Sequence, residues 1–268
     1  MQTAWNQRWI ERRGIYRPAD EVINTRRYEV SPIQGDAIAK AFITRHHYSG
    51  TYPAARYRFG LYHSQELVGV AVFSHPSNDK VLAIFPGRPI ESAELGRFVL
   101  NDTVPGNGET WFLARCFELL RHAGIIGIVS FSDPIARQAF DGRTIFAGHV
   151  GTIYQAHNAT YLGRATARRL KILPDGTVLS DRTVQKIRAQ EKGHQYATRL
   201  LETFGAEPIS GCPVAWLDQW LPKLTRPLAH PGNHKYAWML QKAHRRHLLA
   251  SAPFPKFVPT AKQLGLFA

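Results

Sequence analysis

The sequence lacks both a cysteine framework and a long apolar segment. Its two cysteines, Cys116 in an apolar helical run and Cys212 beside a proline, have no paired spacing that indicates disulfides or a zinc site. No apolar run approaches the roughly 18–20 residues that cross a bilayer, and the first six residues lack the apolar core of a signal peptide. We therefore expect a soluble protein of the reducing cytoplasm, with no membrane partner.

Acidic residues are scarce as well. Asp and Glu number 20 against 34 Lys and Arg, which gives a formal net charge of +14 and a pI near 10.1. The excess is uneven, because residues 1–163 hold 17 basic and 14 acidic side chains, whereas residues 164–268 hold 17 and 6. This charge favours a polyanionic partner, nucleic acid first, held mainly by the C-terminal part. The alternative is a solvated basic surface.

Hydrophobic periodicity predicts an α/β fold with a central sheet flanked by helices. We expect strands at residues 56–62, 67–73, 93–100, 124–131, 160–164 and 234–240, and helices at residues 32–48, 111–122, 151–158, 180–188, 196–204 and 214–221. The predicted parts are an N-terminal arm or edge element (1–30), a core (31–165), a basic and mostly helical insertion (166–232), and a C-terminal strand that completes the core sheet before an extended tail (233–268).

The run from Ser130 to Asp133 and the stretch from Gly148 to Ala156 are the most informative part of the chain. Asp133 follows the buried strand at residues 124–131, at the edge where α/β sheets place their chemistry. Tyr154 lies on the next predicted helix, so the two form a plausible active-site pair. Alternatively, Asp133 only caps the segment before Pro134, and Tyr154 belongs to the core.

The loop at residues 101–110 joins a predicted strand to a predicted helix. Such a glycine-containing turn leaves backbone N–H groups unpaired at the helix N-terminus, where a phosphate or another anion can bind. The alternative is a connector without a ligand. Arg97, within the apolar strand, needs either a carboxylate partner such as Glu94 or Asp133, or an anionic ligand.

Two consecutive histidines, His46 and His47, precede Tyr48 at the end of the first predicted helix. They offer a second base, or a site at which His47 and Asp133 hold iron or zinc. A histidine pair at a helix end can also have only a surface role.

The order helix, hairpin, strand, glycine turn, helix, strand, helix, strand resembles the Gcn5-related N-acetyltransferase (GNAT) fold, in which this turn holds the pyrophosphate of an acyl-CoA. Four motifs further resemble the Mom proteins of bacteriophages: residues 94–98, 107–113, 132–133 and 148–156. The resemblance implies a GNAT-like transferase that adds a carbamoylmethyl group to the N6 amine of adenine in DNA. This modification would protect phage DNA from restriction in the host cytoplasm.

The resemblance also implies the site. Its catalytic positions fall on His47, Tyr48, Asp133 and Tyr154, with Asp133 as the general base. Donor binding would fall on the strand arginine and the turn, namely Arg97, Gly106, Asn107, Gly108 and Thr110. The donor stays open between acyl-CoA and another phosphate-bearing carrier such as aminoacylated tRNA, and iron is a further candidate. The link from Pro134 to Ala147 is longer than is usual in the family.

Double-stranded DNA is the expected partner, and its target adenine would have to leave the base stack. We expect Tyr48, Tyr52 and Tyr57 to stack on the flipped base. The predicted DNA-binding residues are Arg56, Tyr57, Arg182, Lys186, Arg188, Arg245 and Arg246. Two alternatives remain open: an acyl-CoA-dependent N-acyltransferase that acts on tRNA, a protein or a small amine, and a non-catalytic nucleic-acid-binding protein on a decayed GNAT core.

Overall fold

The computed structural model describes residues 5–11, 13–18, 21–241, 244, 248–250 and 252–256. The chain forms two compact units. Unit 1 comprises residues 1–134, 149–165 and 233–268, and unit 2 comprises residues 135–148 and 166–232. Each has its own apolar core.

Unit 1 is built on a seven-stranded sheet with the order β10-β14-β7-β6-β5-β4-β3. In chain order, its strands are β3 (Tyr28–Pro32), β4 (Ala55–His63), β5 (Glu66–Ser74), β6 (Ser92–Leu100), β7 (Gly127–Ser132), β10 (Thr160–Arg164) and β14 (His234–Met239). Neighbouring strands run antiparallel except β6 and β7, which are parallel. The predicted mixed α/β class is confirmed.

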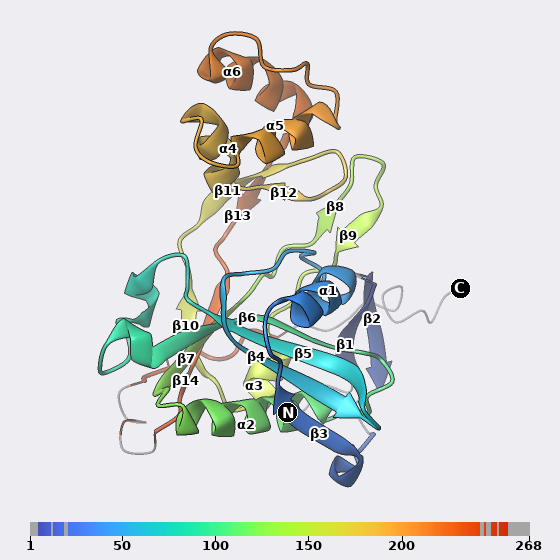
Figure 1. Ribbon diagram of the computed structural model, residues 1–268, viewed down its shortest axis with the longest axis vertical. Helices are drawn as coiled ribbons and strands as arrows, with labels where there is room; N and C mark the ends of the chain where they lie inside the picture. Colours follow the sequence, from blue (N-terminus) through green and yellow to red (C-terminus); the bar gives the residue numbers. More distant parts are fainter. Residues whose placement is uncertain are drawn as a thin grey trace. The chain divides into compact units, whose positions relative to one another are not determined.

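Helices cover both faces of this sheet (Figure 1). Helices α2 (Gly108–His122) and α3 (Thr152–Ala156) lie on one face, and α1 (Ala37–His46) lies on the other. Strand β5 explains how the layers are held: Ala71 and Phe73 join the cluster under α2, while Val70 and Val72 join the cluster under α1. Successive side chains of a strand point to opposite faces, so a nearly continuous apolar run builds both cores.

The N-terminal segment forms a hairpin of β1 (Trp5–Ile10) and β2 (Arg13–Pro18). Three short 3₁₀ turns complete unit 1: η1 (Thr25–Arg27), η2 (Asp79–Leu82) and η3 (Pro89–Glu91). The helix predicted from residue 32 begins only at Ala37, because Pro32 still pairs with Phe59 in the sheet. The strand predicted from residue 124 begins at Gly127, because Gly124, at φ 83°, ends the turn after α2.

Unit 2 has a three-stranded sheet of order β12-β11-β13, formed by β11 (Arg168–Ile172), β12 (Val178–Leu179) and β13 (Arg226–His230). Its helices are α4 (Asp181–Arg188), α5 (His194–Glu202) and α6 (Pro213–Leu224), and the Ser180 side chain caps α4. Within the described part of the chain, no helix is long and apolar enough to cross a membrane.

Residues 135–148, which we expected in the core, fall in unit 2. They form the small hairpin of β8 (Arg137–Gln138) and β9 (Thr144–Phe146). Its tip is tied to unit 2, because the Phe140 N–H donates to the Pro174 carbonyl (2.8 Å) and the Arg226 guanidinium lies 4.0 Å from the centre of the Phe140 ring.

Candidate active-site cavity

The seven-stranded sheet opens between its two parallel strands. Strand β6 pairs with β7 only from Ser92 to Glu94, opposite Gly127 to Val129, and the ladder ends there. Just beyond, the Ser130 hydroxyl donates to the Leu95 carbonyl (3.0 Å). Among the described strands, the later residues of β6 therefore pair with β5 alone.

A cavity of about 410 Å³ lies at this opening, within the usual size range of small-molecule sites. Seven segments of unit 1 contribute to its walls: β1, the residues after α1, the later part of β6, the first turn of α2, Phe131 of β7, α3 with the residues around it, and Phe254 of the C-terminal tail. The cavity thus combines segments that are far apart in the sequence.

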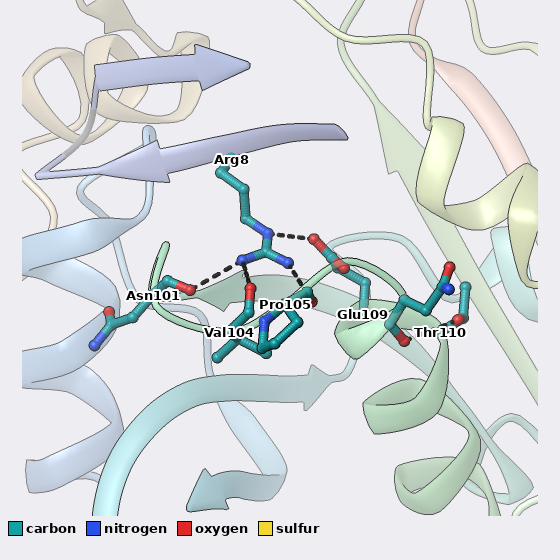
Figure 2. Close-up of polar contacts among 7 residues, drawn as sticks. Arg8, Asn101, Val104, Pro105, Glu109 and Thr110 are labelled. Atoms are coloured by element: carbon teal, nitrogen blue, oxygen red, sulfur yellow. Dashed lines mark hydrogen bonds and ion pairs between the residues drawn. The ribbon is translucent and has the colours of Figure 1, made fainter. Parts of the chain in front are cut away.

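Arg8 of β1 is buried and reaches the loop before α2 (Figure 2). Its guanidinium forms an ion pair with Glu109 and donates to the carbonyl oxygens of Asn101 (3.0 Å), Val104 (2.6 Å) and Pro105 (3.1 Å). A buried charge is tolerated only when it is paired and hydrogen-bonded, and both buried charges here meet that condition. The hairpin is thereby fixed to the turn.

That turn is the one predicted to hold a donor. Asn107, at φ 65°, is the N-cap residue just before α2, and the Thr110 hydroxyl donates to its carbonyl (3.1 Å). Asn107 and Thr110 line the cavity, whereas Gly106 and Gly108 are buried outside its lining. The N–H groups of Glu109 and Thr110 lie in the first helical turn, where the helix itself offers no acceptor, so the turn fits an anionic donor group.

His47 and Tyr48 both line the cavity, and His149 joins them from the segment before α3. The main-chain N–H of Ser49 donates to Nδ1 of His47 (3.1 Å), which leaves the proton of the neutral ring on Nε2. The Tyr48 hydroxyl lies 3.4 Å from Nε2 of His149. Burial holds the pKa of His47 well below its ordinary value, and nearby Arg97 and His149 lower it further. His47 is therefore a neutral imidazole at neutral pH.

Arg97 lies beside this group but is not one of the residues lining the cavity. Its guanidinium donates to the Thr51 carbonyl (2.9 Å), the Thr51 hydroxyl (2.7 Å) and the Gly96 carbonyl (2.5 Å). Among the described residues, it forms no ion pair with Glu94 or Asp133. Two oxygens of Thr51, in the loop after α1, and the Gly96 carbonyl of β6 thus take the place of the carboxylate that was one of its two expected partners. Burial lowers the pKa of Arg97 and raises that of Glu94.

Tyr154 is buried and lines the cavity from α3. Burial raises the pKa of its phenol, and a hydrogen bond with Ser130 opposes the rise. Gly151, at φ 74°, is the N-cap residue just before α3, and a Cβ there would lie 2.8 Å from both the Tyr154 and the Tyr236 rings. Only glycine fits this backbone and leaves room for Tyr154. The raised pKa keeps the phenol protonated at neutral pH, which is the form that a proton donor requires.

Asp133 is described, but it is not one of the cavity-lining residues. Its backbone carbonyl accepts a hydrogen bond from the His149 N–H (2.8 Å), which ties the end of β7 to the cavity wall. The predicted Asp133–Tyr154 pair is therefore represented in the cavity by Tyr154 alone.

A metal site finds no support in the described part of the chain, where no group of three or more His, Cys, Asp or Glu side chains is placed to hold an ion. A site made by His47 and Asp133 would thus need ligands from elsewhere.

The predicted DNA-binding residues fall in both units. In unit 1, Arg56 donates to the carbonyls of Ser92 (2.7 Å) and Ile90 (2.6 Å), and Tyr57 packs against the core under α2. In unit 2, Arg182 is paired with Glu191, Lys186 is half-buried and Arg188 is exposed. Arg245 and Arg246 lie outside the described residues.

The cavity residues that sequence reasoning missed include Arg8, Trp9, Glu109 and His149. Neither Arg8 nor Trp9 carries a local signal, because each is one of many arginines and aromatic residues in an N-terminal segment of weak periodicity. Glu109 and His149 lie inside motifs that the sequence analysis singled out. The available signal was position: Glu109 follows the glycine-containing turn, and His149 lies just before α3.

These features define a mixed α/β protein whose cavity opens between two separating parallel strands. The chain belongs to the Mom protein family, whose sequence profile matches residues 27–212. The predicted family is thereby confirmed. No curated protein matches the sequence.

Solved acetyltransferases match the structure at low similarity. A tandem GNAT protein from the clavulanic acid biosynthesis pathway gives a TM-score of 0.40 at 9% identity, covering 80% of this chain and 99% of its own. A Bacillus subtilis acetyltransferase in complex with CoA gives 0.35 at 9% with the same coverage. An N-acetyltransferase from Staphylococcus aureus Mu50 gives 0.28 at 11%, covering 69% and 68%. At such TM-scores nothing about this protein is inferred from these structures, and the strand pairing itself defines the fold.

Proposed function

We propose that this protein is a transferase that modifies adenine in double-stranded DNA, adding a carbamoylmethyl-type group to the N6 amine. Membership in the Mom family supports a role in DNA modification. The net charge of +14 supports a polyanionic substrate. In a phage-infected cell, such a modification would protect the DNA from restriction.

The observation that carries the proposal is Tyr154, a buried phenol with a raised pKa that lines a cavity where β6 and β7 separate. The N6 amine is a poor nucleophile, because its lone pair is delocalised into the ring. It would attack an electrophilic carbon of the donor and lose a proton, while the bond to the leaving group breaks and Tyr154 protonates that group. Asp133 remains the proposed base, acting from the end of β7.

A phosphate-bearing donor would supply the activated carbon. Asn107, Thr110 and the first-turn N–H groups of α2 would bind its phosphates, and neutral His47 with Tyr48 would orient the reacting groups. Arg97 would act through the Thr51 loop that it holds. DNA phosphates would be bound by exposed basic side chains such as Arg188 of unit 2.

Mass spectrometry of nucleosides tests the proposal, using DNA from cells that express the full chain. We expect an N6-modified deoxyadenosine that falls roughly 100-fold or more with Tyr154→Phe and that is also lost with Asp133→Ala. Tyr196→Phe, on the exposed face of α5, is the matched control and should change nothing. Unmodified DNA together with acyl-CoA turnover would instead indicate an N-acyltransferase, and neither product would indicate a non-catalytic nucleic-acid-binding protein.

A further inference from the structure

Three aromatic side chains form one continuous wall of the cavity. This aromatic wall consists of Trp9 of β1, Tyr48 after α1 and His149 before α3, and all three are half-buried. The Trp9 and Tyr48 ring centres are 4.8 Å apart, and those of Tyr48 and His149 are 5.7 Å apart. His47, which also lines the cavity, packs against Tyr48 with 4.2 Å between the ring centres. The wall thus combines three distant segments of unit 1.

The N-terminal hairpin holds Trp9 in place. Trp9 is paired with Gly14 in the hairpin register, and a Cβ on Gly14 would lie 3.1 Å from the indole. The glycine therefore leaves space for the ring to lie against β2. One residue earlier, Arg8 fixes β1 to the turn before α2 through Glu109 and three carbonyls. A strand anchored on one side presents its next side chain in a defined direction on the other.

We propose that the aromatic wall is the stacking surface for a purine base turned out of duplex DNA, with Trp9 as its main stacking residue. This rests on the proposed function and names the part of the cavity that takes the base. Rings 4.8 Å apart are already in contact, so the base lies over the wall and not between Trp9 and Tyr48. Stacking on aromatic side chains is how proteins commonly hold an unpaired base.

The chemistry of the surroundings favours a base over a phosphate at this wall. The wall presents aromatic rings, and the His47 imidazole that packs against Tyr48 is neutral. The other tyrosines expected to stack, Tyr52 and Tyr57, do not line the cavity. Tyr57 packs against the core under α2, and the Tyr52 hydroxyl donates to Asp36 (2.9 Å). Tyr52 and Trp9 both pack against the core under α1, but of these two only Trp9 lines the cavity. Of the three predicted tyrosines, only Tyr48 lines the cavity.

Base extrusion can be measured separately from chemistry. The probe is a pool of duplexes with randomised flanks, each carrying one 2-aminopurine opposite an abasic site, where a base leaves the stack at least cost. Fluorescence of 2-aminopurine reports its environment, and anisotropy of an end label reports DNA binding. Wild type, Trp9→Ala, Trp9→Phe and the exposed-tyrosine control Tyr196→Ala are compared as full chains, with their unfolding midpoints recorded.

We expect Trp9→Ala to weaken the 2-aminopurine response roughly 10- to 100-fold, while Trp9→Phe and Tyr196→Ala keep it within about threefold. DNA binding by anisotropy should change less, because phosphate contacts remain. An unchanged response in a folded Trp9→Ala protein would overturn the proposal, and so would an equal loss with Trp9→Phe. If extrusion depends on Trp9 but no N6-modified nucleoside forms, the wall stands and the proposed reaction fails. If the N6-modified nucleoside forms but extrusion does not depend on Trp9, the proposed reaction stands and the aromatic wall is not the stacking surface.

Discussion

Two arginine–glutamate pairs in the two units differ mainly in their burial. In Arg8–Glu109 of unit 1, the side chains are 2% and 6% exposed, whereas in Arg182–Glu191 of unit 2 they are 64% and 33% exposed. Arg8 also donates to three loop carbonyls, while both terminal nitrogens of Arg182 go to Glu191 alone. The same two residue types therefore build a fixed joint in one unit and an exposed, exchangeable contact in the other.

The difference follows from solvation. Water competes for both partners of an exposed pair, so its net contribution is small and salt weakens it. A buried pair has no such competitor, and removal of one partner leaves an uncompensated charge. The joint at Arg8 can thus set the geometry of a cavity, whereas Arg182 can leave Glu191 for a phosphate.

The strongest test of this contrast is Arg8→Met. It leaves the Glu109 carboxylate buried and unpaired, and should lower the free energy of unfolding by about 3–5 kcal/mol. Urea unfolding followed by tryptophan fluorescence measures it. The double variant Arg8→Met with Glu109→Gln removes both charges and should recover a large part of the loss.

Arg182→Met is the matched control in unit 2 and should leave the unfolding midpoint unchanged. Equal effects of Arg8→Met and Arg182→Met would refute the contrast. Failure of the double variant to recover stability would mean that the loop carbonyls, and not the charge of Glu109, account for the loss.

The sequence predicted the layers of unit 1 because burial enforces a periodicity that can be read locally, as in the run at residues 67–73. It also singled out Tyr154 and the turn at residues 101–110, which contribute to the cavity lining and whose functional roles stay predictions. It could not predict Arg8–Glu109 or the aromatic wall, because Arg8 and Glu109 are 101 residues apart and Trp9 meets Tyr48 only through tertiary packing. Asp133 lies outside the cavity lining for a related reason: the periodicity of a strand locates its end but not the distant segments that pack around it.

A smaller effect on stability is expected at His47, because burial prevents its imidazole from taking up a proton. Its pKa is lowered in the folded protein, so between that value and about 6.5 the unfolded chain binds more protons than the folded one. Stability from His47 is therefore present at neutral pH and is lost as the pH falls below about 6.5, by up to roughly 1.4 kcal/mol per pH unit. His47→Gln should reduce the slope of the unfolding free energy against pH by that amount.

Unfolding free energies measured from pH 7 to pH 5 check this. His122→Gln, at the exposed end of α2, is the control for loss of a histidine. His46, His157 and His234 also have lowered pKa values and keep contributing a slope in every variant, so the difference between profiles is what matters. A His47→Gln profile parallel to that of the wild type would show that the imidazole protonates without loss of the fold.

The smallest expected effect is that of Arg182→Ala on DNA binding. Because its partner Glu191 is exposed on the same unit, Arg182 can exchange that carboxylate for a DNA phosphate at little cost. Loss of one phosphate contact should reduce the slope of log affinity against log salt by about 1, without a change in sequence preference. Anisotropy titrations from about 50 to 200 mM salt measure the slope.

The control is Arg143→Ala, which removes the same charge at another exposed arginine of unit 2, one paired with Asp141. If both variants lower the slope equally, net charge rather than the face of α4 draws unit 2 to DNA. If Arg182→Ala alone leaves it unchanged, the pair with Glu191 persists in the complex and its exposure does not make it exchangeable.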